Sequence, residues 1–168
     1  MLRMNKYKID FLQFPEGGDE ALDILLDDAF FASLDRSEIL GGELKTNIRI
    51  REIAGVYELW FSIVGIVKVA CDRCLDEMVL PIDTKNELKV KLGDSFEDTG
   101  EFVVLPEDDG TLDLSWYIYE FVALNIPIKH VHEEGQCNKD MVACLNEHLA
   151  TLTDEDVESC QWSDEDKC

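Results

Sequence analysis

The strongest constraint on the fold is an alternation of apolar and polar residues, with period two, between residues 44 and 92. Successive side chains of a β-strand point to opposite faces, so this pattern predicts strands with one packed face and one solvated face. Short turns at residues 54–55 and 71–74 divide it into three segments. The pattern therefore predicts a three-stranded antiparallel meander as the scaffold of the domain. The side chains predicted to share the packed face are Leu44, Thr46, Ile48 and Ile50, then Tyr57, Leu59, Phe61, Ile63, Val67 and Val69, then Met78, Leu80, Ile82, Leu88, Val90 and Leu92.

Weaker patterns on both sides of the meander predict shorter elements. Residues 4–14 predict a strand that ends in a turn at residues 15–18. Residues 21–34 fit a helix, or equally a short strand that leads into one helical turn. Beyond the meander, the pattern predicts a strand over residues 101–105, a helix over 115–125 with Asp113 or Ser115 as N-cap, and a helix over 138–149.

The order of these elements predicts an α+β fold. We expect an antiparallel β-meander, either a twisted sheet or a partial barrel, with a few short helices packed at one side. A length of 168 residues and a hydrophobic content of 46% suffice for one domain with a sizeable core. The predicted organisation is a single domain over residues 1–150 and an acidic, flexible tail over residues 151–168.

Hydropathy and cysteine usage indicate in which cellular compartment the protein is expected. No apolar run approaches the roughly 20 residues that a membrane helix needs, and the basic residues near the start precede no apolar stretch of the kind found in secretory signals. We therefore expect a soluble, cytoplasmic protein. In a reducing compartment, metal binding or burial as free thiols is a better expectation for the six cysteines than a disulfide framework.

The charge is large, negative and uneven. A net charge of −22 argues against a protein that coats nucleic acid by charge alone. Residues 44–91 are nearly neutral, with eight basic and seven acidic side chains, whereas residues 92–128 hold nine acidic side chains and no Lys or Arg. Direct contact with RNA, if it occurs, should therefore use the polar face of the meander. The basic residues predicted there are Arg49, Arg51, Lys85, Lys89 and Lys91.

A less specific role for these basic residues is the favoured interpretation. They can simply pair across strands with Glu58, Asp83 and Glu87, and each such pair contributes little. The acidic loop at residues 94–101 and the acidic tail would then attract a basic protein.

The pair Cys71-x-x-Cys74 lies at the turn between two predicted strands. Two thiolates at this spacing can bind one tetrahedral metal ion, and a complete site needs two further ligands. His130, His132, Cys137 and Cys144 are the candidates. The alternative is that all of these are ordinary reduced residues near a hairpin. A thioredoxin-type motif is disfavoured because that motif opens a helix, whereas a strand follows here.

No arrangement typical of an active site is present. The sequence lacks the G-x-S-x-G, H-E-x-x-H and phosphate-cradling glycine motifs. His130 and His132 have no evident partner for acid–base chemistry. Trp116, Tyr117, Tyr119 and Phe121 fall at helical positions that are expected mostly to enter the core, with a partner surface as the alternative. We predict a protein that is not an enzyme, the alternative being a small zinc or thiol-dependent enzyme.

The stretch Gly65-Ile66-Val67-Lys68-Val69-Ala70-Cys71-Asp72-Arg73-Cys74-Leu75 resembles the C-x-R-C signature of the YceD family. Downstream, Leu112-Asp113-Leu114 is expected to open a helix, and Pro127, His132 and Cys137 follow it in the order seen in that family. Unlike some relatives, this chain has no second C-x-x-C motif at Cys137. The resemblance therefore favours Cys71, Cys74, His132 and Cys137 as the ligand set, with zinc as the candidate metal.

The resemblance also implies a function. YceD proteins are bacterial and chloroplast proteins named for the accumulation of large-subunit ribosomal RNA. A member would be a non-catalytic factor in ribosome biogenesis that supports the accumulation or maturation of that RNA. Its expected partner is a ribosomal precursor or a basic ribosome-associated protein.

Overall fold

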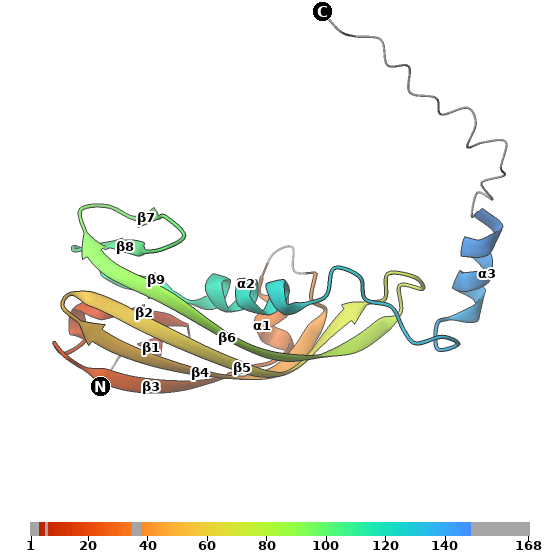
Figure 1. The fold of residues 1–168 in the computed structure, drawn as a ribbon, viewed down its shortest axis with the longest axis horizontal. Coiled ribbons are helices and arrows are strands. Elements are labelled where there is room, and N and C mark those ends of the chain that lie inside the picture. The colour runs from red at the N-terminus through yellow and green to blue at the C-terminus, as the bar shows by residue number, and fades with distance from the viewer. Residues whose placement is uncertain (1–3, 6, 35–37, 149–168) are drawn as a thin grey trace, which may run out of the picture.

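The computed structural model describes residues 4–5, 7–34 and 38–148, and a single long sheet dominates it (Figure 1). The strands of this sheet are β3 (Asp19–Leu26), β4 (Gly41–Ile53), β5 (Val56–Ala70), β6 (Glu77–Gly93), β7 (Glu97–Asp98) and β8 (Val103–Pro106), in the spatial order β3-β4-β5-β6-β8-β7. Neighbouring strands are antiparallel except β6 and β8, which pair in parallel. The predicted antiparallel meander is thus confirmed as β4, β5 and β6.

Two turns of different geometry join the three long strands. Between β4 and β5, Ala54 and Gly55 both have positive φ, 53° and 81°. A two-residue turn with this backbone matches the right-handed twist of the flanking strands. Between β5 and β6, the chain makes the longer turn that contains both cysteines of the C-x-x-C motif.

Shorter elements cover one side of the sheet. A second, small sheet has the order β1-β2-β9 and consists of β1 (Met4–Asn5), β2 (Lys8–Asp10) and β9 (Thr111–Asp113). The helical elements are the 3-10 turn η1 (Phe11–Gln13), α1 (Asp28–Ala32), α2 (Ser115–Asn125) and α3 (Lys139–His148). Helices α1 and α2 lie on the same side of the long sheet, and α3 stands at the far end near the β5–β6 hairpin (Figure 1).

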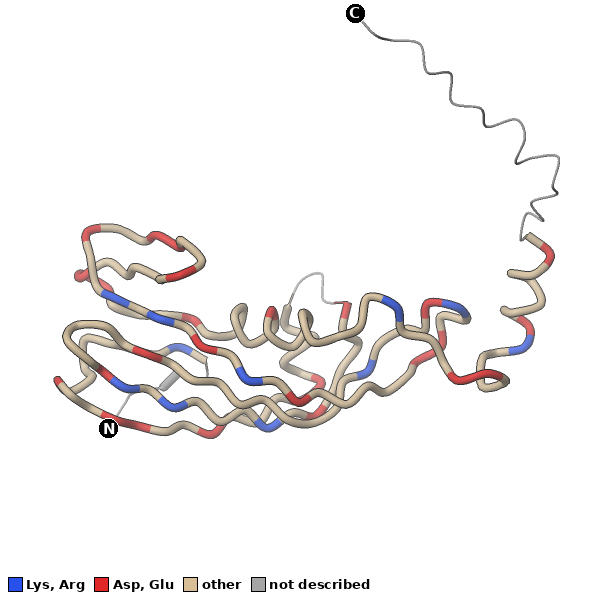
Figure 2. The backbone as a smooth tube through the Cα atoms, in the orientation of Figure 1, with Lys and Arg blue, Asp and Glu red and all other residues tan. Residues whose placement is uncertain are grey.

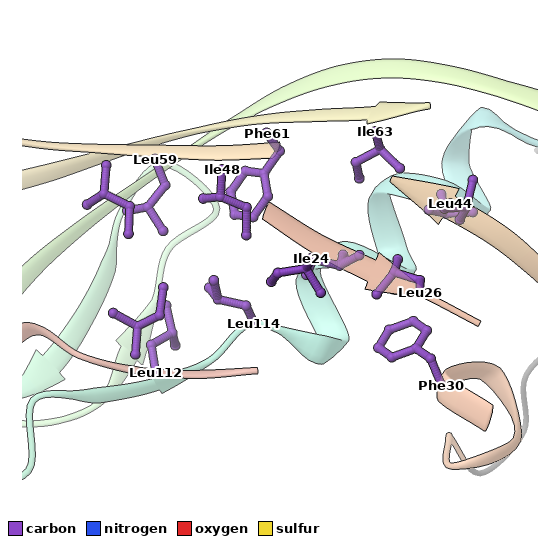
Figure 3. Packing of buried hydrophobic residues seen from close by; sticks show 14 of the residues in the cluster. Ile24, Leu26, Phe30, Leu44, Ile48, Leu59, Phe61, Ile63, Leu112 and Leu114 are labelled. Carbon is purple, nitrogen blue, oxygen red and sulfur yellow. The ribbon is translucent and has the colours of Figure 1, made fainter. Parts of the chain in front are cut away.

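The core lies between the long sheet and this covering layer (Figure 3). Leu44, Ile48 and Ile50 of β4 and Leu59 and Ile63 of β5 are completely buried. They meet α1 through Phe30 and Phe31, β9 through Leu112, and α2 through Ile118 and Val122. We call this the inner face of the sheet. The predicted apolar set of the meander forms it, although Met78, Leu80, Leu88 and Leu92 of β6 are only partly buried.

The ambiguous segment at residues 21–34 is a strand followed by one helical turn. Strand β3 ends at Leu26, and the Asp27 side chain then accepts a hydrogen bond from the Phe30 amide, 3.1 Å away, as the N-cap of α1. Near the start, the predicted strand at residues 4–14 is broken into β1, β2 and η1. The Asp10 side chain accepts a bond from the Leu12 amide and so favours the tight turn.

The second half contains one further difference from the prediction. Leu112-Asp113-Leu114 does not open a helix, because Leu112 and Asp113 belong to β9 and α2 begins at Ser115. Leu114 occupies the N-cap position, and the Asp113 carboxylate accepts a bond from the Ser115 amide at 2.9 Å. Three of the four aromatic residues of α2 pack against the core, whereas Trp116 is 57% exposed.

The remaining predicted elements match in type. The strand expected at residues 101–105 is β8, the loop before it contains the short β7, and the helix expected at residues 138–149 is α3. The predicted tail at residues 151–168 lies outside the described residues. None of the helices in the described ranges is long and apolar enough to cross a membrane.

Candidate metal centre

The turn between β5 and β6 places two cysteines side by side. The Cys71 amide donates to the Asp76 carbonyl, and the Cys71 carbonyl accepts from the Leu75 amide, both at 2.9 Å. Leu75 has a positive φ of 62°, which reverses the chain so that β6 can begin at Glu77. The two thiols are buried, with 0% of Cys71 and 1% of Cys74 exposed.

The segment after α2 returns to this turn. The Asp72 amide donates to the His130 carbonyl at 2.9 Å, and the His130 amide donates to the Asp72 carboxylate at 2.7 Å. The His130 ring lies 3.6 Å from the same carboxylate, and its Nδ1 lies 3.0 Å from the Pro127 carbonyl. Through these contacts, His130 links the β5–β6 turn to the segment after α2. The link brings His132 and Cys137 next to the C-x-x-C turn.

Cys71, Cys74, His132 and Cys137 form a compact group that we call the Cys/His cluster. Cys71 Sγ lies 3.9 Å from Cys137 Sγ, and His132 Nδ1 lies 3.3 Å from Cys74 Sγ and 4.0 Å from Cys137 Sγ. All four donor atoms lie within 4.8 Å of one another. Zn–S bonds of about 2.3 Å give tetrahedron edges of roughly 4 Å. The cluster therefore has the donors and the dimensions to hold one metal ion.

Groups around the cluster orient its donors. His132 Nε2 lies 3.3 Å from the Glu77 carbonyl. If Nε2–H donates to that carbonyl, Nδ1 is unprotonated and free to bind a metal. Histidines that bind a metal usually donate their other ring N–H to an acceptor in this way. Met78, Val131 and Val142 pack around the sulfurs, and Val142 comes from α3. A metal at this position would thus lie in a largely apolar environment.

Electrostatics at the cluster favour thiolate at one sulfur. Burial raises the pKa of Cys71, but amide N–H donors from Cys74, His132 and Arg73, together with the Cys74 thiol, outweigh burial and lower it to about 6. The hydrogen bond with Cys74 raises the pKa of His132. Burial and the neighbouring sulfurs raise the pKa of Cys137. Metal ligands bind as thiolate and neutral imidazole, and the lowered pKa brings Cys71 toward the thiolate state at neutral pH.

Two of the sequence candidates lie outside the cluster. Cys144 is an exposed free thiol on α3, and His130 forms the hydrogen bonds to Asp72 and Pro127 given above. The structure thus brings together the four residues that the family resemblance favoured.

The five predicted basic residues share one face of the sheet, opposite the core, which we call the outer face. Arg49 pairs with Asp19 of β3 through bonds of 2.9 and 2.6 Å, Lys89 lies 3.6 Å from Glu87, and Lys91 lies over the Phe102 ring at 5.2 Å. Arg51 and Lys85 are exposed.

The predicted partners of these basic residues are only partly correct. Glu87 has a partner, but along its own strand, and neither Glu58 nor Asp83 forms an ion pair with any of the described residues. Asp19 was not predicted as the partner of Arg49, because no local sequence pattern shows that β3 pairs with β4. Trp60 was also missed, although its position between two inner-face residues of β5 marks it as an aromatic side chain on the outer face.

Comparison with known proteins gives one match. The family model for the large ribosomal RNA subunit accumulation protein YceD matches residues 59–166, a range that contains the whole Cys/His cluster. No match was found among curated proteins, and none among solved structures.

Proposed function

Because the chain belongs to the YceD family, we propose that it is a non-catalytic factor that supports the accumulation or maturation of large-subunit ribosomal RNA. The observation that carries this proposal is the family match over residues 59–166, which covers most of β5 and all of β6, α2 and the Cys/His cluster. A long sheet with one face exposed suits a protein that acts by binding.

The proposal includes a structural zinc ion in the Cys/His cluster. Three sulfurs and one imidazole nitrogen are a donor set typical of structural zinc. All four donors come from the protein, so a tetrahedral ion would have no open position for a substrate or for an activated water. The ion would tie the β5–β6 turn to the segment after α2.

The alternative function is a small zinc or thiol-dependent enzyme. The single observation in its favour is the Cys71 pKa of about 6, since a thiolate at neutral pH is a nucleophile. Complete burial of Cys71 opposes it. Alkylation of the zinc-loaded protein separates the two functions. A structural site leaves Cys71, Cys74 and Cys137 unmodified while exposed Cys144 reacts, whereas preferential modification of Cys71 would favour the enzyme.

The proposed partner is a basic, ribosome-associated protein. Residues 94–101 form an exposed acidic loop that includes β7, at the end of the sheet remote from the Cys/His cluster (Figures 1 and 2). Asp98 there has a structural role, because its carboxylate accepts bonds from the Tyr117 hydroxyl and the Gly100 amide, both at 3.0 Å. Asp94, Glu97 and Glu101 are exposed and remain available to a partner.

Two experiments test the proposal. Depletion of the protein in its own cells should lower the level of large-subunit ribosomal RNA, and the wild-type chain should restore it. Capture of partners from extract should then depend on the acidic loop. We expect Asp94→Asn, Glu97→Gln and Glu101→Gln together to reduce recovery of basic ribosomal proteins, while Glu133→Gln and Glu134→Gln, exposed at the other end of the molecule, should not. Unchanged ribosomal RNA after depletion would refute the proposed function.

A further inference from the structure

On the outer face of the long sheet, the strand register shows which side chains lie next to one another on neighbouring strands. Across one row, Arg49 of β4 stands opposite Trp60 of β5, and Trp60 stands opposite Glu87 of β6. In the adjacent row, Asn47, Ser62 and Lys85 are partners in the same way. Helices α1 and α2 lie on the other side of the sheet, so they leave these rows uncovered (Figure 1).

These two rows form a shallow hollow of about 420 Å³. Trp60 is partly exposed at its centre, with Arg49 on one neighbouring strand and Lys85 on the other. Ser62 and Asn47 supply polar groups at the side. The hollow is large enough for a planar heteroaromatic group beside the indole.

The basic side chains beside the Trp60 indole are placed to bind an anion. Two bonds to Asp19 hold the Arg49 guanidinium in place, yet its side chain remains 60% exposed. A guanidinium has five N–H donors, so this pairing leaves donors for a second acceptor. Lys85 is exposed and forms no ion pair with any side chain in the described ranges. The one carboxylate in the lining, that of Glu87, lies 3.6 Å from Lys89.

We propose that this hollow is a binding site for single-stranded RNA, in which a base stacks on Trp60 while Arg49 and Lys85 contact the adjacent phosphates. The inference rests on the proposed function, since a factor for ribosomal RNA would meet unpaired RNA segments. Aromatic side chains on exposed sheets stack bases of any sequence, and basic neighbours hold the backbone. Asn47 donates its Nδ2 to Asp23 at 2.8 Å, which leaves its carbonyl oxygen as an acceptor for a base edge.

A basic protein is the less suitable occupant of this hollow. Its lysines would approach Arg49 and Lys85, whose like charges repel them, whereas phosphates are attracted. Double-stranded RNA is also less suitable, because its bases are stacked on one another and cannot lie on the indole. The site thus differs in chemistry and in place from the acidic loop proposed to contact a protein.

The test uses the full chain with Trp60 as its single tryptophan, obtained by Trp116→Phe and Trp162→Phe. The probe is a fluorescein-labelled single-stranded RNA of about twelve nucleotides, close to the site size of a small sheet domain. At low salt we expect RNA to quench Trp60 fluorescence in parallel with the rise in probe anisotropy. In the otherwise wild-type chain, Trp60→Ala should weaken binding about 10-fold and Trp60→Phe much less.

Charge variants provide the matched control. Lys85→Gln should weaken binding and lower the slope of log affinity against log salt by about 0.7. Lys45→Gln makes the same change on the outer face but outside the hollow, and should leave both quantities nearly unchanged. Circular dichroism of each variant confirms that the sheet is retained.

In the RNA titrations, three results would overturn the inference: no RNA binding at low salt, binding that leaves Trp60 fluorescence unchanged, and equal affinity of the wild type and Trp60→Ala. Quenching by a basic ribosomal protein in place of RNA would also overturn it, in favour of a protein partner. If Trp60→Ala fully restores ribosomal RNA in depleted cells, this site is refuted while the proposed function stands. If depletion itself has no effect, the proposed function is refuted.

Discussion

At the scale of single residues, Thr46 is the polar exception in an otherwise apolar core. Its side chain is 1% exposed on the inner face of β4, between fully buried Leu44 and Ile48. Its hydroxyl has no hydrogen-bond partner among the described residues. The free energy of burying an unpaired hydroxyl opposes folding, whereas a methyl group of the same size would be favourable there.

Thr46→Val should therefore stabilise the protein. We expect an increase of about 1 kcal/mol in the free energy of unfolding, measured by urea denaturation. Thr46→Ser is the control, because it keeps the hydroxyl and removes the methyl group, and it should destabilise the fold. A loss of stability in Thr46→Val would instead show that the hydroxyl has a partner in solution.

Cys71 gives a prediction about pH. In metal-free protein its pKa of about 6 means that the thiolate predominates above pH 6 and the thiol below it. Because this pKa lies below the unfolded value, the thiolate stabilises the fold fully above about pH 9, and this stabilisation is lost as the pH falls to about 6. The ultraviolet thiolate absorbance, taken as the difference between the wild type and Cys71→Ser, should titrate with a midpoint near 6. A midpoint near 9 would contradict the hydrogen bonding described for this sulfur.

At the scale of elements, the long strands depend on one close approach between β4 and β5. Gly65 of β5 lies opposite Leu44 of β4. A Cβ atom at Gly65 would stand 2.2 Å from the Glu43 carbonyl oxygen and 2.9 Å from the Leu44 Cα. Both neighbours are backbone atoms in a paired strand, so neither can move aside at low energy. Glycine is the residue that permits the two strands to meet here.

Gly65→Ala should destabilise the protein by about 3 kcal/mol, the upper range for an overpacked site. Val64→Ala at the next position of the same strand is the control. Val64 is 49% exposed on the outer face, so its truncation should change stability by less than about 1 kcal/mol. Comparable urea midpoints for the two variants would show that the strands can separate locally without loss.

At the scale of the whole molecule, the Cys/His cluster joins segments that are remote in sequence. Cys71 and Cys137 are 66 residues apart, yet their sulfurs lie 3.9 Å from each other. Helix α3 has no buried residue, and its Val142 packs against the cluster. The core of the long sheet is formed by other residues. The cluster should therefore control the far end of the molecule without controlling the sheet.

If the cluster holds zinc as proposed, removal of the ion by a chelator should loosen that end selectively. We expect faster amide hydrogen exchange at residues 71–76 and 130–148, and little change in the centres of β4, β5 and β6. Cys137→Ser should produce the same local pattern, and chelator should then add nothing. Uniform loss of protection across the sheet would mean that the metal supports the entire fold.

Periodicity along the chain was sufficient to predict the meander and its two faces. A period of two fixes which side chains share a face whatever lies around them, so Leu44 to Leu92 could be assigned locally. The turn at Ala54 and Gly55 and the helix over residues 115–125 carry equally local signals. The ligand set Cys71, Cys74, His132 and Cys137 followed from a family resemblance, because spacing alone left His130 and Cys144 as equal candidates.

The relations between distant segments depend on tertiary structure. The parallel pairing of β8 with β6, the bond of Arg49 to Asp19, and the place of Trp60 between Arg49 and Lys85 all depend on strand order and register. Such pairings join residues whose sequence separation carries no periodic signal. Local patterns along the chain therefore indicate which side chains face the core and which face solvent. The three-dimensional packing determined which of them meet, because the free energy of pairing depends on the whole sheet.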